Sequence, residues 1–171
     1  MQQSRRLVVV RHAAAEQGAA TDAERTLTDG GRDDARTAGE WLAAEGLVVD
    51  HALVSAALRA QETWASLAAG AAADLEPDVS RLLYSAEPET VLDLLREVPT
   101  ESSCVVVVGH NPTMAYLANL LDDGEGDEAA ATELTTRGFP TCSLAVFAYD
   151  GEWADLDVTS ATLRAFHVGR A

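Results

Sequence analysis

The chain has 171 residues, enough for one domain with a hydrophobic core. All 12 basic residues are arginines, and 28 acidic residues bring the formal net charge to -16 at pH 7. A surface this acidic repels nucleic acid and anionic membranes. The absence of lysine excludes a P-loop lysine, a Schiff-base lysine and a lysine general base.

Predicted strands and helices alternate along the first two-thirds of the chain. Short apolar runs rich in valine and leucine predict buried strands, and apolar residues at helical spacing between capping signals predict helices. The strands are expected over residues 7–10, 50–55, 79–83, 104–108, 142–148 and 161–168. The helices are expected over residues 29–45, 56–73, 88–95 and 113–121, and the acidic segment 122–133 is expected to be a solvated loop.

This alternation predicts an α/β fold, with a mostly parallel sheet that is covered on both faces. The last two strands follow each other closely and predict an antiparallel edge. We find no repeat, linker or boundary, so residues 1–171 are expected to form one domain.

The sequence also makes a cytoplasmic location the expectation. No apolar run could span a bilayer, and the run after the basic N-terminus is too short for a signal peptide. Cys104 and Cys142 both open apolar runs, so we expect two buried thiols rather than a disulfide. The spacing of the cysteines is not typical of a metal site. Because the chain is strongly acidic, neither nucleic acid nor a membrane is expected as a partner.

Polar side chains follow four of the predicted strands at the point where each strand ends. They are Arg11 and His12, then Ser55 and Arg59, then Tyr84 and Glu87, and finally His110. Because the carboxyl ends of parallel strands meet at one edge of a sheet, these side chains are expected to converge. Two histidines and two arginines suit a phosphoryl group: the arginines neutralise its oxygens, one histidine attacks and the other donates a hydrogen bond. The other two histidines, His51 and His167, are expected to be structural or surface residues.

Several short motifs follow one another along the chain: Arg11-His12-Ala13-Ala14-Ala15-Glu16, then residues 24–28 with 31–32, then 53–63, 83–86, 107–112 and 139–141. This ordered set resembles the histidine phosphatase (phosphoglycerate-mutase-like) superfamily, and more narrowly its SixA-type phosphohistidine phosphatases. The resemblance covers nearly the whole chain. It implies a three-layer α/β/α sandwich.

The resemblance also implies roles for individual residues. His12 would be the nucleophile, forming a transient phosphohistidine that water hydrolyses. Arg11 and Arg59 would clamp the phosphoryl oxygens, His110 would donate a hydrogen bond to them, and Asn111 is expected beside them. The arginines and His110 would carry the charge that a metal ion otherwise balances, so neither a metal nor another cofactor is expected.

Two positions depart from the commoner pattern of the superfamily. Ala13 stands where Arg-His-Gly is usual, as in the SixA-type branch. Larger members carry a carboxylic general acid after the third strand, and here Glu87 is the nearest candidate and Glu89 the next. A phosphoramidate leaving group would need less protonation than an alkoxide, which fits a branch without a clear acid.

The resemblance implies phosphohistidine on a protein as the expected substrate. The short loops after the third and fourth strands leave little material for a lid, so an open pocket would admit such a substrate and would also admit a small phosphate ester. A small-molecule phosphomonoesterase and a non-catalytic phosphoprotein-binding module remain alternatives, and a mutase would need more enclosure. Asp155-Leu156-Asp157 is similar to a haloacid-dehalogenase motif, but no hydrophobic strand precedes it. A cysteine-based phosphatase would need an arginine near its cysteine, which neither cysteine has.

Overall fold

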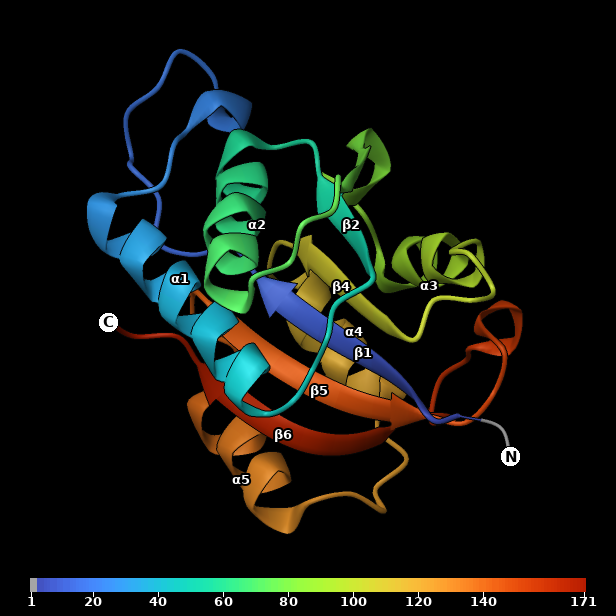
Figure 1. Ribbon diagram of the computed structural model, residues 1–171. Coiled ribbons are helices and arrows are strands. Elements are labelled where there is room, and N and C mark those ends of the chain that lie inside the picture. The colour runs from blue at the N-terminus through green and yellow to red at the C-terminus, as the bar shows by residue number, and fades with distance from the viewer. Residues whose placement is uncertain (1–2) are drawn as a thin grey trace.

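The computed structural model describes residues 3–171, and its six strands form a single sheet in the order β3-β2-β4-β1-β5-β6 (Figure 1). The strands are β1 (Arg5–Arg11), β2 (His51–Ser55), β3 (Asp78–Ser80), β4 (Cys104–Gly109), β5 (Ser143–Tyr149) and β6 (Thr162–Val168). Strands β1 to β4 pair in parallel, whereas β5 runs antiparallel to both of its neighbours, β1 and β6. The predicted mostly parallel sheet is therefore confirmed. The last two strands form the predicted antiparallel edge: β6 is the edge strand, and β5 lies between β6 and β1.

Helices cover both faces of this sheet. They are α1 (Asp29–Ala44), α2 (Leu58–Ala71), α3 (Pro88–Arg96), α4 (Thr113–Leu121) and α5 (Glu128–Arg137). Successive side chains of a strand point to opposite faces. Accordingly, Val8 and Val10 of β1 pack with α1 and α2, while Leu7 and Val9 pack with α3, α4 and α5. Burial on both faces explains the continuous valine runs of β1 and β4 and produces the three-layer α/β/α arrangement.

Two predicted segments differ from the structure. The acidic segment was expected to be a loop through residue 133, but α5 begins at Glu128. Asp127 caps this helix by accepting a hydrogen bond from the Ala130 backbone at 2.8 Å, and Ala130 and Leu134 bury one face. Burial of these two apolar residues against the rest of the chain thus favours a helix, although the polar composition of the segment is typical of a loop. The weak third strand is also shorter, because residues 81–83 form the 3-10 turn η2 (Arg81–Leu83).

The two cysteines are free and buried, as predicted, and burial raises the pKa of each thiol to about 12. Within residues 3–171, no helix is both long and apolar enough to cross a membrane.

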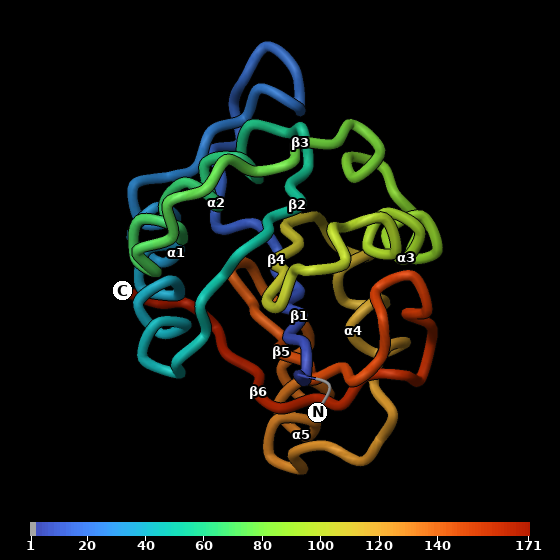
Figure 2. Tube along the Cα trace, turned by 45° about the vertical axis from the view of Figure 1, so that its right-hand side comes forward, coloured from blue at the N-terminus to red at the C-terminus, as the bar shows by residue number. Residues whose placement is uncertain are grey.

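The segment between β1 and α1 is the part of the fold that matters most for the site. It projects beyond the carboxyl end of the sheet and carries the 3-10 turn η1 (Asp22–Glu24) (Figures 1 and 2). Glu62 of α2 fastens its returning arm by accepting hydrogen bonds from the Leu27 backbone at 2.7 Å and from Arg32 at 3.1 Å. Gly31 lets the start of α1 approach the backbone of Ala14 closely, since a Cβ at this position would lie 2.2 Å from the Ala14 carbonyl oxygen.

Candidate active site

The carboxyl ends of β1, β2 and β4 lie side by side and bring four predicted side chains together. Arg11 pairs with Gly109 in the register of β1 and β4, and the His12 backbone N–H donates to the Gly109 carbonyl at 3.0 Å. The ring centroids of His12 and His110 lie 5.2 Å apart, and Ser55 at the end of β2 lies 2.8 Å from His110 Nε2. Convergence thus follows from strand order alone, since β4 is the neighbour of both β1 and β2.

His12 is a buried, neutral imidazole with a defined orientation. Its side chain is among the few buried polar groups, at 9% exposure, and its Nδ1 lies 2.7 Å from the Ala13 carbonyl oxygen. Only a protonated Nδ1 can donate to that oxygen, which leaves the lone pair on Nε2. Burial lowers the pKa of His12 to about 4, with a smaller contribution from Arg59 and Arg11. At neutral pH, Nε2 is therefore free to act as a nucleophile.

His110 is also held neutral, because burial and the neighbouring His12 lower its pKa to about 3. The Ser55 hydroxyl oxygen accepts the Ala57 backbone N–H at 3.2 Å, so its own hydrogen is available to His110 Nε2. This arrangement favours the tautomer with the His110 proton on Nδ1, where it can be donated to an anion. The edge of the Tyr84 ring packs against His110 at a centroid distance of 5.7 Å.

Arg11 and Asn111 meet at one backbone carbonyl. Arg11 Nη1 donates to the Phe139 carbonyl at 3.1 Å, and Asn111 Nδ2 donates to the same oxygen at 2.7 Å. Asn111 Oδ1 accepts the Ala115 backbone N–H at 3.3 Å. Asn111 thus uses its oxygen and one of its two amide hydrogens to hold the backbone around the site, and its contact with phosphate stays a prediction. Burial lowers the pKa of Arg11.

Arg59 lies in the first turn of α2, and both of its terminal nitrogens, Nη1 and Nη2, donate hydrogen bonds to one residue, Asp22. Its Nη1 donates to the Asp22 backbone carbonyl at 2.9 Å, and its Nη2 donates to Asp22 Oδ2 at 3.1 Å. The same carboxylate accepts a hydrogen bond from the Tyr84 hydroxyl and one from Arg25 Nη1 at 3.1 Å. These donors, Tyr84 first, hold the pKa of Asp22 well below its usual range.

Sequence reasoning missed Asp22 and Arg25 as neighbours of the site. Arg25 stands in a motif that carries the family resemblance, and its charge contributes to the lowered pKa of His12. Asp22 has no signal in the sequence, because its position depends on the path of the segment before α1.

The structure does not bring the expected general acid into this network. Glu87 is an exposed N-cap residue of α3, and within residues 3–171 its carboxylate makes no hydrogen bond or ion pair; Glu89 is also exposed. Asp22 is instead the carboxylate that contacts the site. His51 lies at the start of β2, and His167 stacks on Trp41 at 4.4 Å, as suits structural histidines.

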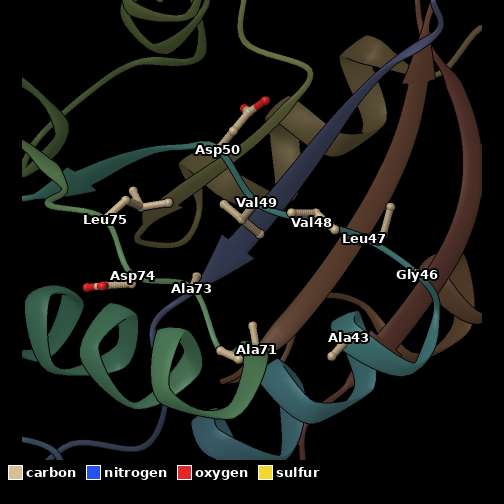
Figure 3. A pocket seen from close by; sticks show the side chains of 11 residues that line it. Ala43, Gly46, Leu47, Val48, Val49, Asp50, Ala71, Ala73, Asp74 and Leu75 are labelled. Carbon is tan, nitrogen blue, oxygen red and sulfur yellow. The ribbon is translucent and has the colours of Figure 1, made fainter.

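A hollow of about 480 Å³ lies at the amino end of β2, away from these residues (Figure 3). Its lining comes from the residues before β2 and from the ends of α1 and α2, and includes Asp50 and Asp74. A second hollow of about 350 Å³ adjoins the site and is lined by Gln17, Thr21, Asp22 and Arg25 among others. Among residues 3–171, no group of three or more His, Cys, Asp or Glu side chains is placed to hold a metal ion.

Comparisons with known sequences and structures find relatives that agree with one another. Residues 7–82 match the model of the histidine phosphatase superfamily, branch 1. The chain is 31% identical to the phosphohistidine phosphatase SixA of Escherichia coli over 122 residues, which cover 68% of this chain and 74% of SixA. A solved structure from Nakamurella multipartitia, assigned as phosphohistidine phosphatase SixA, is 32% identical with a TM-score of 0.85 and covers 98% of both chains.

A further solved structure, of the protein histidine phosphatase SixA complexed with tungstate, is 25% identical. Its TM-score is 0.76, and the alignment covers 95% of this chain and 96% of that one. The α/β fold, the ordered motifs and these relatives all agree. The chain belongs to the SixA-type branch of the histidine phosphatase superfamily and is a phosphatase.

Proposed function

We propose that this phosphatase hydrolyses phosphohistidine on a protein substrate, through a covalent phosphohistidine on His12. The observation that carries the proposal is a set of unpaired nitrogen atoms around the His12 ring. Within residues 3–171, five buried side-chain polar atoms have no hydrogen-bond partner, and three belong to the site: Arg11 Nε, Arg59 Nε and His110 Nδ1. Buried polar groups are nearly always paired, so these three N–H groups call for an acceptor such as a phosphoryl oxygen.

In the first step, His12 Nε2 attacks the phosphorus in line with the leaving nitrogen of the substrate. A P–N bond to His12 forms, the P–N bond of the substrate breaks, and its electron pair stays on the leaving imidazole, which takes a proton from solvent. Arg11, Arg59 and His110 stabilise the charge on the phosphoryl oxygens as it redistributes. The positive charge comes from two guanidinium groups, so the proposal needs no metal ion.

In the second step, water attacks the phosphorus and the P–Nε2 bond breaks. Inorganic phosphate leaves, a proton from the water passes to solvent, and His12 returns to its neutral form. The hydrogen bond from Nδ1 to the Ala13 carbonyl keeps the ring in place during both steps, so the same nitrogen can attack again.

The short connections around the site support a protein substrate. The helix α3 begins at Pro88, soon after η2 ends at Leu83, and α4 begins at Thr113, soon after β4 ends at Gly109. These connections leave little chain for a lid over the histidines. The two SixA relatives named for phosphohistidine and protein histidine phosphatase activity support the same substrate class.

A parallel assay tests this substrate. The protein is given a phosphohistidine-bearing protein and, separately, small phosphate esters, and we expect kcat/KM to be at least about tenfold higher for the protein substrate. A higher value for the small esters would favour a phosphomonoesterase instead.

The His12→Ala variant separates an enzyme from a binding module. We expect this variant to lose turnover, with His51→Ala as the matched control at the far end of β2. If His12→Ala kept wild-type turnover, His12 would not be the nucleophile. If the wild-type protein bound phosphoproteins without turning them over, the chain would be a binding module.

A further inference from the structure

Arg59 uses one edge of its guanidinium group for an internal partner and leaves the other edge unused. A guanidinium group can form paired hydrogen bonds along its end edge, through Nη1 and Nη2, or along its side edge, through Nε and one Nη. Asp22 occupies the end edge completely, with its backbone carbonyl on Nη1 and its carboxylate on Nη2. Arg59 Nε, on the side edge, is buried and has no partner.

Asp22 is itself held by two further residues. Arg25, on the same loop, donates to its Oδ1, and Tyr84, which follows η2, donates to its Oδ2. The Arg59 guanidinium also lies over the Tyr84 ring, 6.0 Å from its centroid. A carboxylate with three donors keeps one position, so it can fix the rotation of the guanidinium that it binds.

We propose that Asp22 is a positioning residue, which holds Arg59 by its end edge so that the Nε edge faces the phosphoryl oxygens. This inference rests on the proposed function, in which Arg59 binds the phosphoryl group. Asp22 itself touches no reacting atom in this account. Its effect on catalysis passes through the orientation of Arg59.

The carboxylate also has an opposing effect, because its negative charge repels a phosphoryl anion. The Asp22 side chain is 53% exposed, whereas the Arg59 side chain is 8% exposed. Water screens a charge that is half exposed, so the repulsion is weak. Without the Asp22 carboxylate, only the backbone carbonyl on Nη1 holds the Arg59 guanidinium, which can then turn away from its binding orientation. Misplacement of a binding group is costly. We therefore expect the effect on orientation to outweigh the repulsion. The two effects predict opposite changes in phosphate affinity when Asp22 is removed: loss of orientation weakens binding, and loss of repulsion strengthens it.

The test measures the dissociation constant of inorganic phosphate and, for the phosphorylated protein, KM and kcat separately. We expect Asp22→Ala to raise both the phosphate dissociation constant and KM about tenfold. Asp22→Asn should recover most of the affinity, because its amide oxygen can still accept from Arg59 Nη2. Glu24→Ala, which removes the same charge from the same turn, should leave both constants unchanged.

A double-mutant cycle distinguishes positioning from general support of the loop. In an Arg59→Ala background, Asp22→Ala should have no further effect on phosphate affinity, because Asp22 acts through Arg59. Independent, multiplied effects of the two changes would overturn the inference, as would tighter phosphate binding by Asp22→Ala. If Arg59→Ala alone left phosphate affinity unchanged, the proposed role of Arg59 in the site would fail first.

Discussion

The charge state of one imidazole decides the chemistry of this site. Burial beside arginines disfavours the protonated ring, so His12 stays neutral well below the ordinary histidine pKa of 6.5. We expect NMR titration of the His12 ring to give a pKa near 4. Titration near 6.5 would contradict the burial argument.

The same shift has a consequence for stability. Because the pKa of His12 is lower in the folded chain, the unfolded chain takes up the proton first as the pH falls. The contribution of His12 to the free energy of unfolding therefore declines between pH 6.5 and about pH 4. Replacement by a residue that does not titrate should flatten this part of the stability curve.

Ser55 is the hydrogen-bond partner of His110 Nε2 and favours one tautomer of that ring. We expect Ser55→Ala to lower kcat/KM by roughly tenfold or more, because His110 Nε2 loses its partner and the ring is no longer held with its proton on Nδ1. Ser102→Ala removes the hydroxyl of another buried serine, before the opposite end of β4, and should leave kcat/KM unchanged. Equal losses in both variants would assign the effect to packing.

At the scale of single residues, the sequence indicated Arg11, His12, Arg59 and His110 because each lies at or just after the end of a strand that was expected to be parallel to the others. The contact between Asp22 and Arg59 could not be predicted. It depends on where Glu62 and Gly31 fasten the segment before α1, and those are contacts between distant parts of the chain.

At the scale of elements, α1 packs closely on α2, the helix that carries Arg59 in its first turn. A Cβ at Gly39 would lie 2.0 Å from the Leu67 carbonyl oxygen of α2. We expect Gly39→Ala to lower the free energy of unfolding by about 1–3 kcal/mol, because the two helices must move apart. Gly30→Ala, in the same helix, meets only Thr28 at 3.8 Å and should not destabilise. Chemical denaturation measures both, and an unchanged Gly39→Ala would contradict this close contact.

The predicted elements agree with the structure where burial and periodicity coincide, as in β1, β4 and α1. The helix α5 was missed because its acidic composition conceals two buried positions, Ala130 and Leu134, on one face. The strand β3 is short because Ser80 caps the turn that follows it. In both places, a tertiary contact or a local cap outweighs the pattern along the chain.

At the scale of the whole molecule, the chain carries a net charge of -16, whereas its candidate site is lined by arginines. Long-range repulsion should slow the encounter with acidic phosphoproteins and speed it with basic ones. We therefore expect kcat/KM to rise with added salt for an acidic phosphoprotein and to fall for a basic one. Stopped assays at low and physiological ionic strength measure this, and the same trend for both substrates would contradict it.

Chemical trapping shows whether a phosphoryl group is transferred to His12. The protein is incubated briefly with a labelled phosphorylated substrate and quenched in alkali, and the labelled residue is identified by peptide mapping. We expect an acid-labile, alkali-stable phosphoryl group on His12, absent from His12→Ala. Label on a serine or an aspartate, or undiminished label in His12→Ala, would contradict it.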